Sequence, residues 1–219
     1  MAHGPIRALR FIHDAIRAEY ALLDDAVSGY TTPGQASAIV EPVKMLTRLI
    51  RGHVHGEDAG YFPALEAKAG PITKPFSMDH DDEGARLDAL DACVDRCAAG
   101  GTQADLIELK RSIAIEGAII DQHMAKEERL LWPLTEELFT PPEQGAIVGA
   151  IIAVIPREEM PVLVPWIMQR QTDADALAYV AVLEKAMPPP AFTMIMGAVK
   201  ARTTEACWAN IAGARPELA

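Results

Sequence analysis

Apolar residues recur at alternating spacings of three and four over most of the first 140 residues, which is the period of a helix with one buried face. The first such stripe runs from Ile6 to Val27, with His13 at its middle. Later stripes predict helices over about 35–68, 75–99 and 104–139, separated by glycine and proline, and no strand pattern competes. Residues 1–140 are therefore predicted to be all-α, an up-down-up-down four-helix bundle.

Pro141 and Pro142 begin a region of different character. Shorter helical stretches are predicted at about 141–154, 158–170, 173–187 and 190–212, with prolines between them. Segments 141–155 and 191–199 are apolar enough to need burial. We expect residues 141–219 to form a C-terminal helical extension that packs on the bundle or on a partner subunit, as in a homodimer. Nothing in this region suggests catalysis.

Histidines and acids on the inward stripes carry the chemistry. Six residues share these positions, one histidine for each helix and two glutamates: His13, His53, Glu57, His80, His123 and Glu127. Buried imidazoles need hydrogen-bond partners in an apolar core, and a shared metal removes that cost. Each glutamate follows a histidine by four residues, so the two side chains lie on one face of a helix. The six residues are predicted to hold a pair of iron or manganese ions, with the glutamates bridging.

A repeat with an offset of 70 residues supports this prediction. His53, Glu57, Phe62 and Pro63 reappear as His123, Glu127, Trp132 and Pro133. A second acid follows each glutamate, so the two segments read as halves of a pseudo-twofold bundle. A zinc-protease HExxH motif is absent, and no histidine has an acid three residues before it, as ferritin-like bundles require.

This set of residues resembles the hemerythrin-like family, also called the HHE cation-binding domain, over about residues 5–140. The segments YFPAL and LLWPL resemble that family's helix ends. The resemblance implies two iron ions in an oxo- or hydroxo-bridged di-iron centre. Family members carry or sense dioxygen, sense iron, or process peroxide and nitric oxide. Oxygen carriers place a second histidine four residues from the one on the third helix, where this chain has Phe76 and Gly84 around His80. Carriers also end with His-x4-Asp, where this chain has His-x3-Glu.

The smaller ligand set bears on function. Four imidazoles, two bridging carboxylates and one shared oxo bridge leave about two of the octahedral positions of two irons open, where a fifth histidine would leave about one. Two open positions favour turnover. We therefore predict a non-haem di-iron oxidoreductase that reacts with hydrogen peroxide or nitric oxide, a peroxidase- or catalase-like stress-defence enzyme. The alternatives are a non-enzymatic sensor of dioxygen, nitric oxide or iron, and a structural bundle with an incidental metal.

Other side chains have two interpretations each. Tyr61, four residues after Glu57, is either beside the metal, where it would fill an open position, or a core tyrosine; the weaker candidates for such a position are Asp79, Glu83 and Glu116. His55 is expected to face outward, and His3 lies in the terminus. Cys93 and Cys97 are either buried small residues or a redox pair. Arg17 and Glu19 suggest a solvated face.

Composition excludes some partners. Lys and Arg number 20 and Asp and Glu 31, a net charge of −11, which disfavours nucleic acids and anionic membranes. No apolar run reaches the roughly 18–20 residues of a membrane span, and the start lacks a signal-peptide pattern. These features and the odd number of cysteines, three, predict a cytoplasmic protein. Its expected ligand is a small molecule.

Overall fold

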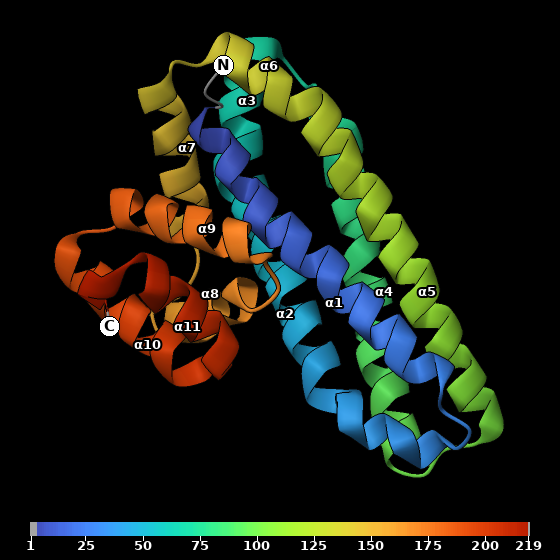
Figure 1. The fold of residues 1–219 in the computed structure, drawn as a ribbon. Coiled ribbons are helices and arrows are strands. Elements are labelled where there is room, and N and C mark those ends of the chain that lie inside the picture. The colour runs from blue at the N-terminus through green and yellow to red at the C-terminus, as the bar shows by residue number, and fades with distance from the viewer. Residues whose placement is uncertain (1–3, 219) are drawn as a thin grey trace.

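The computed structural model describes residues 4–218, which are all-α and contain no strand. The first part comprises η1 (Pro5–Leu9), α1 (Arg10–Ser28), η2 (Pro33–Ile39), α2 (Val40–Gly56), η3 (Glu57–Tyr61), α3 (Phe62–Ala69), α4 (Lys74–Ala98), α5 (Gln103–Lys126), η4 (Glu127–Leu131) and α6 (Trp132–Leu138). The second part comprises α7 (Pro141–Ala153), α8 (Met160–Met168), α9 (Asp173–Ala186), α10 (Pro189–Arg202), α11 (Glu205–Ala214) and η5 (Pro216–Leu218). Helices α1, α2, α4 and α5 form the predicted bundle (Figure 1).

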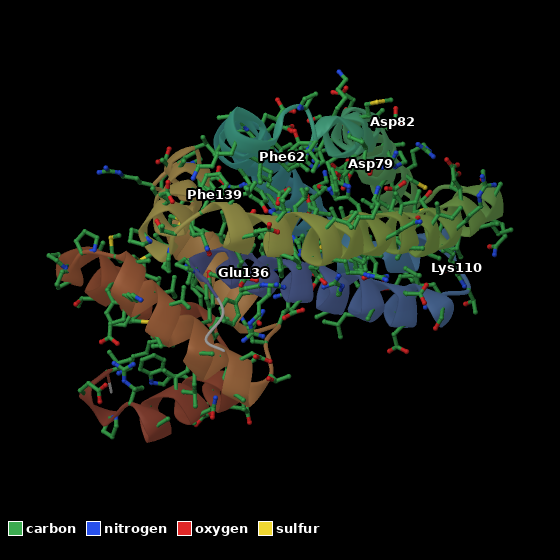
Figure 2. The ribbon with its side chains drawn as sticks, turned by 90° about the horizontal axis from the view of Figure 1, so that it is seen from above. Phe62, Asp79, Asp82, Lys110, Glu136 and Phe139 are labelled. Atoms are coloured by element: carbon green, nitrogen blue, oxygen red, sulfur yellow. The ribbon has the colours of Figure 1, made fainter. Side chains whose placement is uncertain are left out.

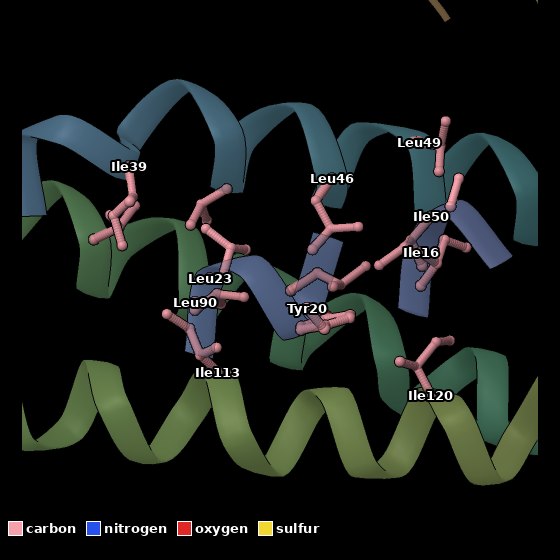
Figure 3. Close-up of a cluster of buried hydrophobic side chains, with 14 of the residues drawn as sticks. Ile16, Tyr20, Leu23, Ile39, Leu46, Leu49, Ile50, Leu90, Ile113 and Ile120 are labelled. Carbon is pink, nitrogen blue, oxygen red and sulfur yellow. The ribbon is translucent and has the colours of Figure 1, made fainter. Parts of the chain in front are cut away.

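The inward stripes meet in one apolar cluster along the bundle (Figure 3). Ile16, Leu46 and Leu90 are fully buried there, and burying each such side chain contributes about 1.5–3 kcal/mol. Cys93 and Cys97 belong to this cluster as well. Burial raises the pKa of the Cys93 thiol to about 12, so the thiol stays protonated, which favours the interpretation as a small core residue.

Two π-helical segments, η3 and η4, interrupt the second and fourth bundle helices at the same point of the 70-residue repeat. The amide of Phe62 donates to the Glu57 carbonyl, and the amide of Trp132 donates to the Glu127 carbonyl, five residues back in each case. The next residue in each segment is proline, which has no N–H to donate and whose ring clashes with the carbonyl four residues earlier. The wide turn accommodates that proline within a continuing helix.

The π turns shift the buried face by one residue. Continued at the regular helical period from His123 and Glu127, the inward stripe would include Leu130, but Leu130 is 60% exposed and Leu131 is buried in its place. The regular helical period no longer holds after the extra residue of a π turn. The predicted continuous helices over 35–68 and 104–139 are for the same reason divided at η3 and η4.

The C-terminal helices contact the bundle at two places. Helix α7 packs against η1 and η3, at the end of the bundle where the chain begins. Helix α8 packs against α1, and α8–α11 share a second apolar cluster (Figure 1). The predicted helix over 190–212 is divided between α10 and α11, where Thr204 caps α11 by accepting a hydrogen bond from the Cys207 amide. The boundary at residue 140 and a homodimer through this region stay predictions.

Glu19 corrects the expectation of a solvated face on α1. Its side chain is only 2% exposed and accepts a hydrogen bond from Arg170, just past α8. The Arg170 guanidinium also lies 3.8 Å from the centre of the Trp166 ring. Arg17 is half-buried and donates to Glu128 at 2.7 Å. Part of this face of α1 is therefore covered by the C-terminal helices.

No helix within residues 4–218 is long and apolar enough to cross a membrane.

Candidate metal centre

All six residues that the sequence predicted as ligands meet in the core, near the end of the bundle that carries α3 and α6. Their exposure is 5% or less. They come from four helices and the two π turns: His13 from α1, His53 from α2, Glu57 from η3, His80 from α4, His123 from α5 and Glu127 from η4. Each π turn begins at the glutamate, so the carboxylate projects into the core one turn beyond its histidine.

The side chains form two groups, within each of which the ligand atoms lie no more than 4.8 Å apart. The first group contains His13, His53, Glu57 and Glu127, and the second contains Glu57, His80, His123 and Glu127. Both groups therefore contain the same two carboxylates, and each has its own pair of imidazoles.

The two carboxylates divide their oxygens between the groups. Glu57 places Oε1 3.6 Å from His53 Nε2 and Oε2 3.7 Å from His80 Nε2. Glu127 places Oε1 3.3 Å from His123 Nε2 and Oε2 3.5 Å from His13 Nε2. Each carboxylate therefore directs one oxygen toward each of the two groups.

Carboxylates on the outer side orient three of the four rings. The Nδ1 contacts are His13 to Glu128 at 2.9 Å, His80 to Asp58 at 3.0 Å and His123 to Asp79 at 3.1 Å. A carboxylate accepts the Nδ1–H, so the Nε2 lone pair points toward the centre.

This orientation turns the N–H donors of these three rings away from the centre. His80 Nε2 and His123 Nε2 lie 3.0 Å apart, and His13 Nε2 and His53 Nε2 lie 3.1 Å apart. The carboxylate oxygens of both glutamates are buried and have no hydrogen-bond partner among the described residues. Lone pairs that face one another in a dry core repel unless a cation lies between them. The residues therefore fit metal cations, with the mixed imidazole and carboxylate donors that iron accepts.

The comparison with known families agrees with this geometry. Residues 4–135 match the family described as the hemerythrin HHE cation binding domain. The chain belongs to this family. Its HHE region covers the whole bundle and ends before α7.

Curated relatives of this HHE protein are plant proteins. Zinc finger protein BRUTUS of Arabidopsis thaliana is 26% identical over 187 residues, and two BRUTUS-like zinc finger proteins of the same plant are 26% and 28% identical. These matches cover 76–84% of this chain but only 14–16% of the relatives. The BRUTUS match covers 84% of 219 residues, about 184, so it includes residues beyond the HHE match. No solved structure matches this chain.

The charges of the HHE carboxylates are coupled. Burial and the neighbouring Glu127 raise the pKa of Glu57 well above its usual value. Burial acts in the same direction on Glu127, but the surrounding imidazoles, with that of His123 first among them, outweigh it and hold its pKa at about 2. Burial lowers the pKa of His53 well below its usual value. Two carboxylates in one dry core cannot both be charged without compensating cations.

Aromatic rings after the π turns cover the outer imidazoles. Phe62 stacks on His80 with ring centres 5.3 Å apart, and Trp132 stacks on His13 at 5.2 Å. Phe62 and Trp132 are equivalent under the 70-residue repeat, and each half of the HHE bundle places its aromatic ring over a histidine of the other half. The rings exclude water and fix the planes of the imidazoles.

Tyr61 lies outside both ligand groups. Its buried hydroxyl donates to Thr135 Oγ1 at 2.8 Å, because Thr135 uses its own proton on the Leu131 carbonyl. Burial also raises the pKa of Tyr61. This favours the core-tyrosine interpretation.

Two of the three weaker ligand candidates have other partners. Asp79 accepts from His123 Nδ1 and from Lys126, between α4 and α5 (Figure 2). Glu116 accepts from Arg86 at 3.1 Å. Glu83 is buried, and burial raises its pKa to about 7. His55 faces outward as expected, and His3 lies outside the described residues.

No role for Asp58 and Glu128 was predicted from the sequence. In the structure Asp58 orients His80, and Glu128 orients His13. The acid that follows each glutamate was the available signal, but nothing local shows which ring it meets, since each one contacts a ring from another helix.

One orienting contact breaks the pseudo-twofold symmetry. Asp79 precedes His80 and holds the ring of His123. The equivalent position before His13 is Ile12, an apolar residue, and His53 Nδ1 has no carboxylate partner within the described chain. The group formed by His80 and His123 therefore has the more anionic surroundings of the two.

Proposed function

We propose that this HHE domain holds a pair of iron ions, bridged by Glu57 and Glu127. The terminal ligands would be His13 and His53 on one ion and His80 and His123 on the other. The observation that carries this proposal is the division of each carboxylate between the two groups, at 3.3–3.7 Å from the ring nitrogens. Tetrahedral zinc sites, by contrast, are usually closed by four ligands of their own.

We propose further that the protein is a non-enzymatic sensor of iron and of a small oxidant. The iron pair would bind dioxygen, hydrogen peroxide or nitric oxide. Bound iron would supply reversible ligand binding and redox capacity at this site. The protein ligands are 5% exposed or less, and Phe62 and Trp132 cover the outer rings. Such a sealed centre suits ligands of two or three non-hydrogen atoms at most. Because the Tyr61 hydroxyl is engaged by Thr135, it is not available as a proton donor to such a ligand.

Peroxide or nitric oxide turnover is the second candidate function. The specific observation in its favour is Phe76, which stands four residues before His80, where an oxygen carrier would have a histidine. Phe76 is 6% exposed and meets the His123 ring edge-on at 6.1 Å. A phenyl ring cannot ligate a metal, so a coordination position is left to an outside ligand.

Metal analysis and spectroscopy on the full chain test both candidates. Protein from iron-supplied cells is assayed for iron, its optical spectrum is recorded, and hydrogen peroxide is added with an oxygen electrode in place. Two irons per chain with a reversible spectral change and no oxygen release support the binding function. Sustained oxygen release would instead support the peroxidase- or catalase-like function. Absence of iron would contradict the proposed metal centre.

The setting of this function is also a proposal. The net charge of −11 and the odd number of cysteines support a cytoplasmic location without a nucleic-acid or membrane partner. Light scattering after size-exclusion chromatography would test a homodimer through the C-terminal helices.

A further inference from the structure

Two glycines let α7 lie directly against the π turn that carries Glu57. A Cβ added to Gly60 would lie 2.8 Å from the Ile151 amide nitrogen and 2.9 Å from the Ala150 carbonyl carbon. A Cβ on Gly56 would lie 2.8 Å from Ile151 Cγ2. The helix therefore touches the backbone of η3 with no side chain between them, so a shift of η3 cannot be absorbed by a rotamer change.

The other half of the bundle lacks this contact. The 70-residue repeat places Lys126 and Leu130 where the first half of the bundle has Gly56, at the end of α2, and Gly60, in η3. The Leu130 side chain is 60% exposed. A side chain at either position would keep a helix from approaching this closely, so only the η3 face can accept α7.

Helix α7 depends on this contact for burial. Glu143 is the only charged residue in Pro141–Ala153. Ile147 and Ile151 are 5% exposed and join an apolar cluster with Tyr61 and Phe62. Undocking would expose a nearly uncharged helix and the aromatic side chains beneath it, which is the kind of surface that recruits a partner.

The state of the metal acts directly on η3. The Glu57 carboxylate, at the first residue of η3, has no hydrogen-bond partner among the described residues and faces Glu127 across the core. Cations between the carboxylates would bind Glu57 and so hold the turn in place, and without them no hydrogen bond from the described residues holds this carboxylate. Gly60, which meets Ile151, thus lies about one helical turn from Glu57, the residue whose surroundings change most when the metal is lost.

We propose that α7 is a metal-dependent latch: iron in the bundle fixes η3 and keeps α7 docked on Gly56 and Gly60, and loss of iron releases α7. This inference rests on the proposed function, since it needs iron at Glu57. Helices α8–α11 have their own attachment to α1, through Glu19 with Arg170 and through Arg10 with Asp175 at 2.7 Å. The latch therefore opens at α7 and leaves the later helices in place.

Hydrogen–deuterium exchange on the full chain tests the latch, with Fe(II) bound and after its removal by a chelator, and with iron content measured in parallel. Removal of iron is expected to lower protection in 141–153 by about tenfold or more and to change α10 by less than about twofold. Gly60→Ala should retain its iron yet show fast exchange of α7 in both states. Gly52→Ala, on the same helix with open space around its Cα, should behave as the wild type.

A second pair of variants lies on α7, away from the metal ligands. Ile151→Ala should weaken the latch, whereas Ile152→Ala, which truncates a 36% exposed neighbour, should not. Two bound irons with α7 equally protected in both states would overturn the latch and leave the proposed function intact. A uniform loss of protection over the whole chain would also overturn it. Failure to bind iron would reject the proposed function itself.

Discussion

The hydroxyl of Tyr61 donates to Thr135 Oγ1 at 2.8 Å and so links the first π turn to the helix that follows the second. The 70-residue repeat pairs Tyr61 with Leu131 and Thr135 with Leu65. The symmetry equivalent of the polar pair Tyr61 and Thr135 is therefore the apolar pair Leu131 and Leu65. The contact closes the end of the bundle next to the metal ligands.

The two partners of this contact should differ when removed singly. Tyr61→Phe leaves Thr135 bonded to the Leu131 carbonyl and should cost about 1 kcal/mol of unfolding free energy. Thr135→Val leaves a buried hydroxyl unsatisfied and should cost about 1–3 kcal/mol, and the double variant should recover part of that loss. Denaturant unfolding measures all three. Iron content should stay unchanged, and its loss in Tyr61→Phe would place Tyr61 at the metal after all.

The shared carboxylates predict how single ligand changes affect metal content. Glu127→Ala removes a ligand from both groups and should lose most of the iron, whereas His13→Ala should retain about one iron per chain. Glu41→Ala, an exposed acid on α2, is the control and should keep two. Elemental analysis decides, and two irons in Glu127→Ala would contradict the ligand set.

Asp79 should strengthen one metal position without touching the metal. Asp79→Asn weakens the acceptor for His123 Nδ1–H, and loss of such an orienting contact typically lowers metal affinity about 10–100-fold. Chelator competition should show one of the two irons released more readily. Asp82→Asn, an exposed change on the same helix (Figure 2), should leave both affinities as they are. Equal weakening of both irons would argue against two distinct positions.

Glu83 predicts a pH dependence of the iron-free protein. Burial raises its pKa from 4.5 to about 7, so between these values the folded state binds more protons than the unfolded state. The contribution of Glu83 to the free energy of unfolding therefore falls as pH rises from 4.5 to about 7, by up to about 3 kcal/mol. Glu83→Gln should lose less stability than the wild type between pH 5 and 8 in denaturant unfolding. Glu137→Gln, at an exposed site, should follow the wild type, and identical curves for Glu83→Gln would contradict the raised pKa.

The helical bundle and the inward position of the four histidines could be predicted from the sequence alone. Helical phase is a local property, so a stripe through Ile6, His13 and Val27 reveals its buried face without knowledge of its neighbours. The repeat of His53 with Glu57 as His123 with Glu127 likewise revealed two matched halves. These features depend on spacing along the chain, which the sequence states directly.

Which side chains contact one another could not be predicted without the three-dimensional packing of the helices. Leu130 faces outward because a π turn shifts the helical phase, and Glu19 is buried because Arg170, 151 residues later, covers it. The preference of α7 for one of two equivalent faces depends on Gly56 and Gly60 meeting Ile151. Such contacts join segments that are far apart in the chain, and their geometry follows from packing in three dimensions rather than from any local pattern.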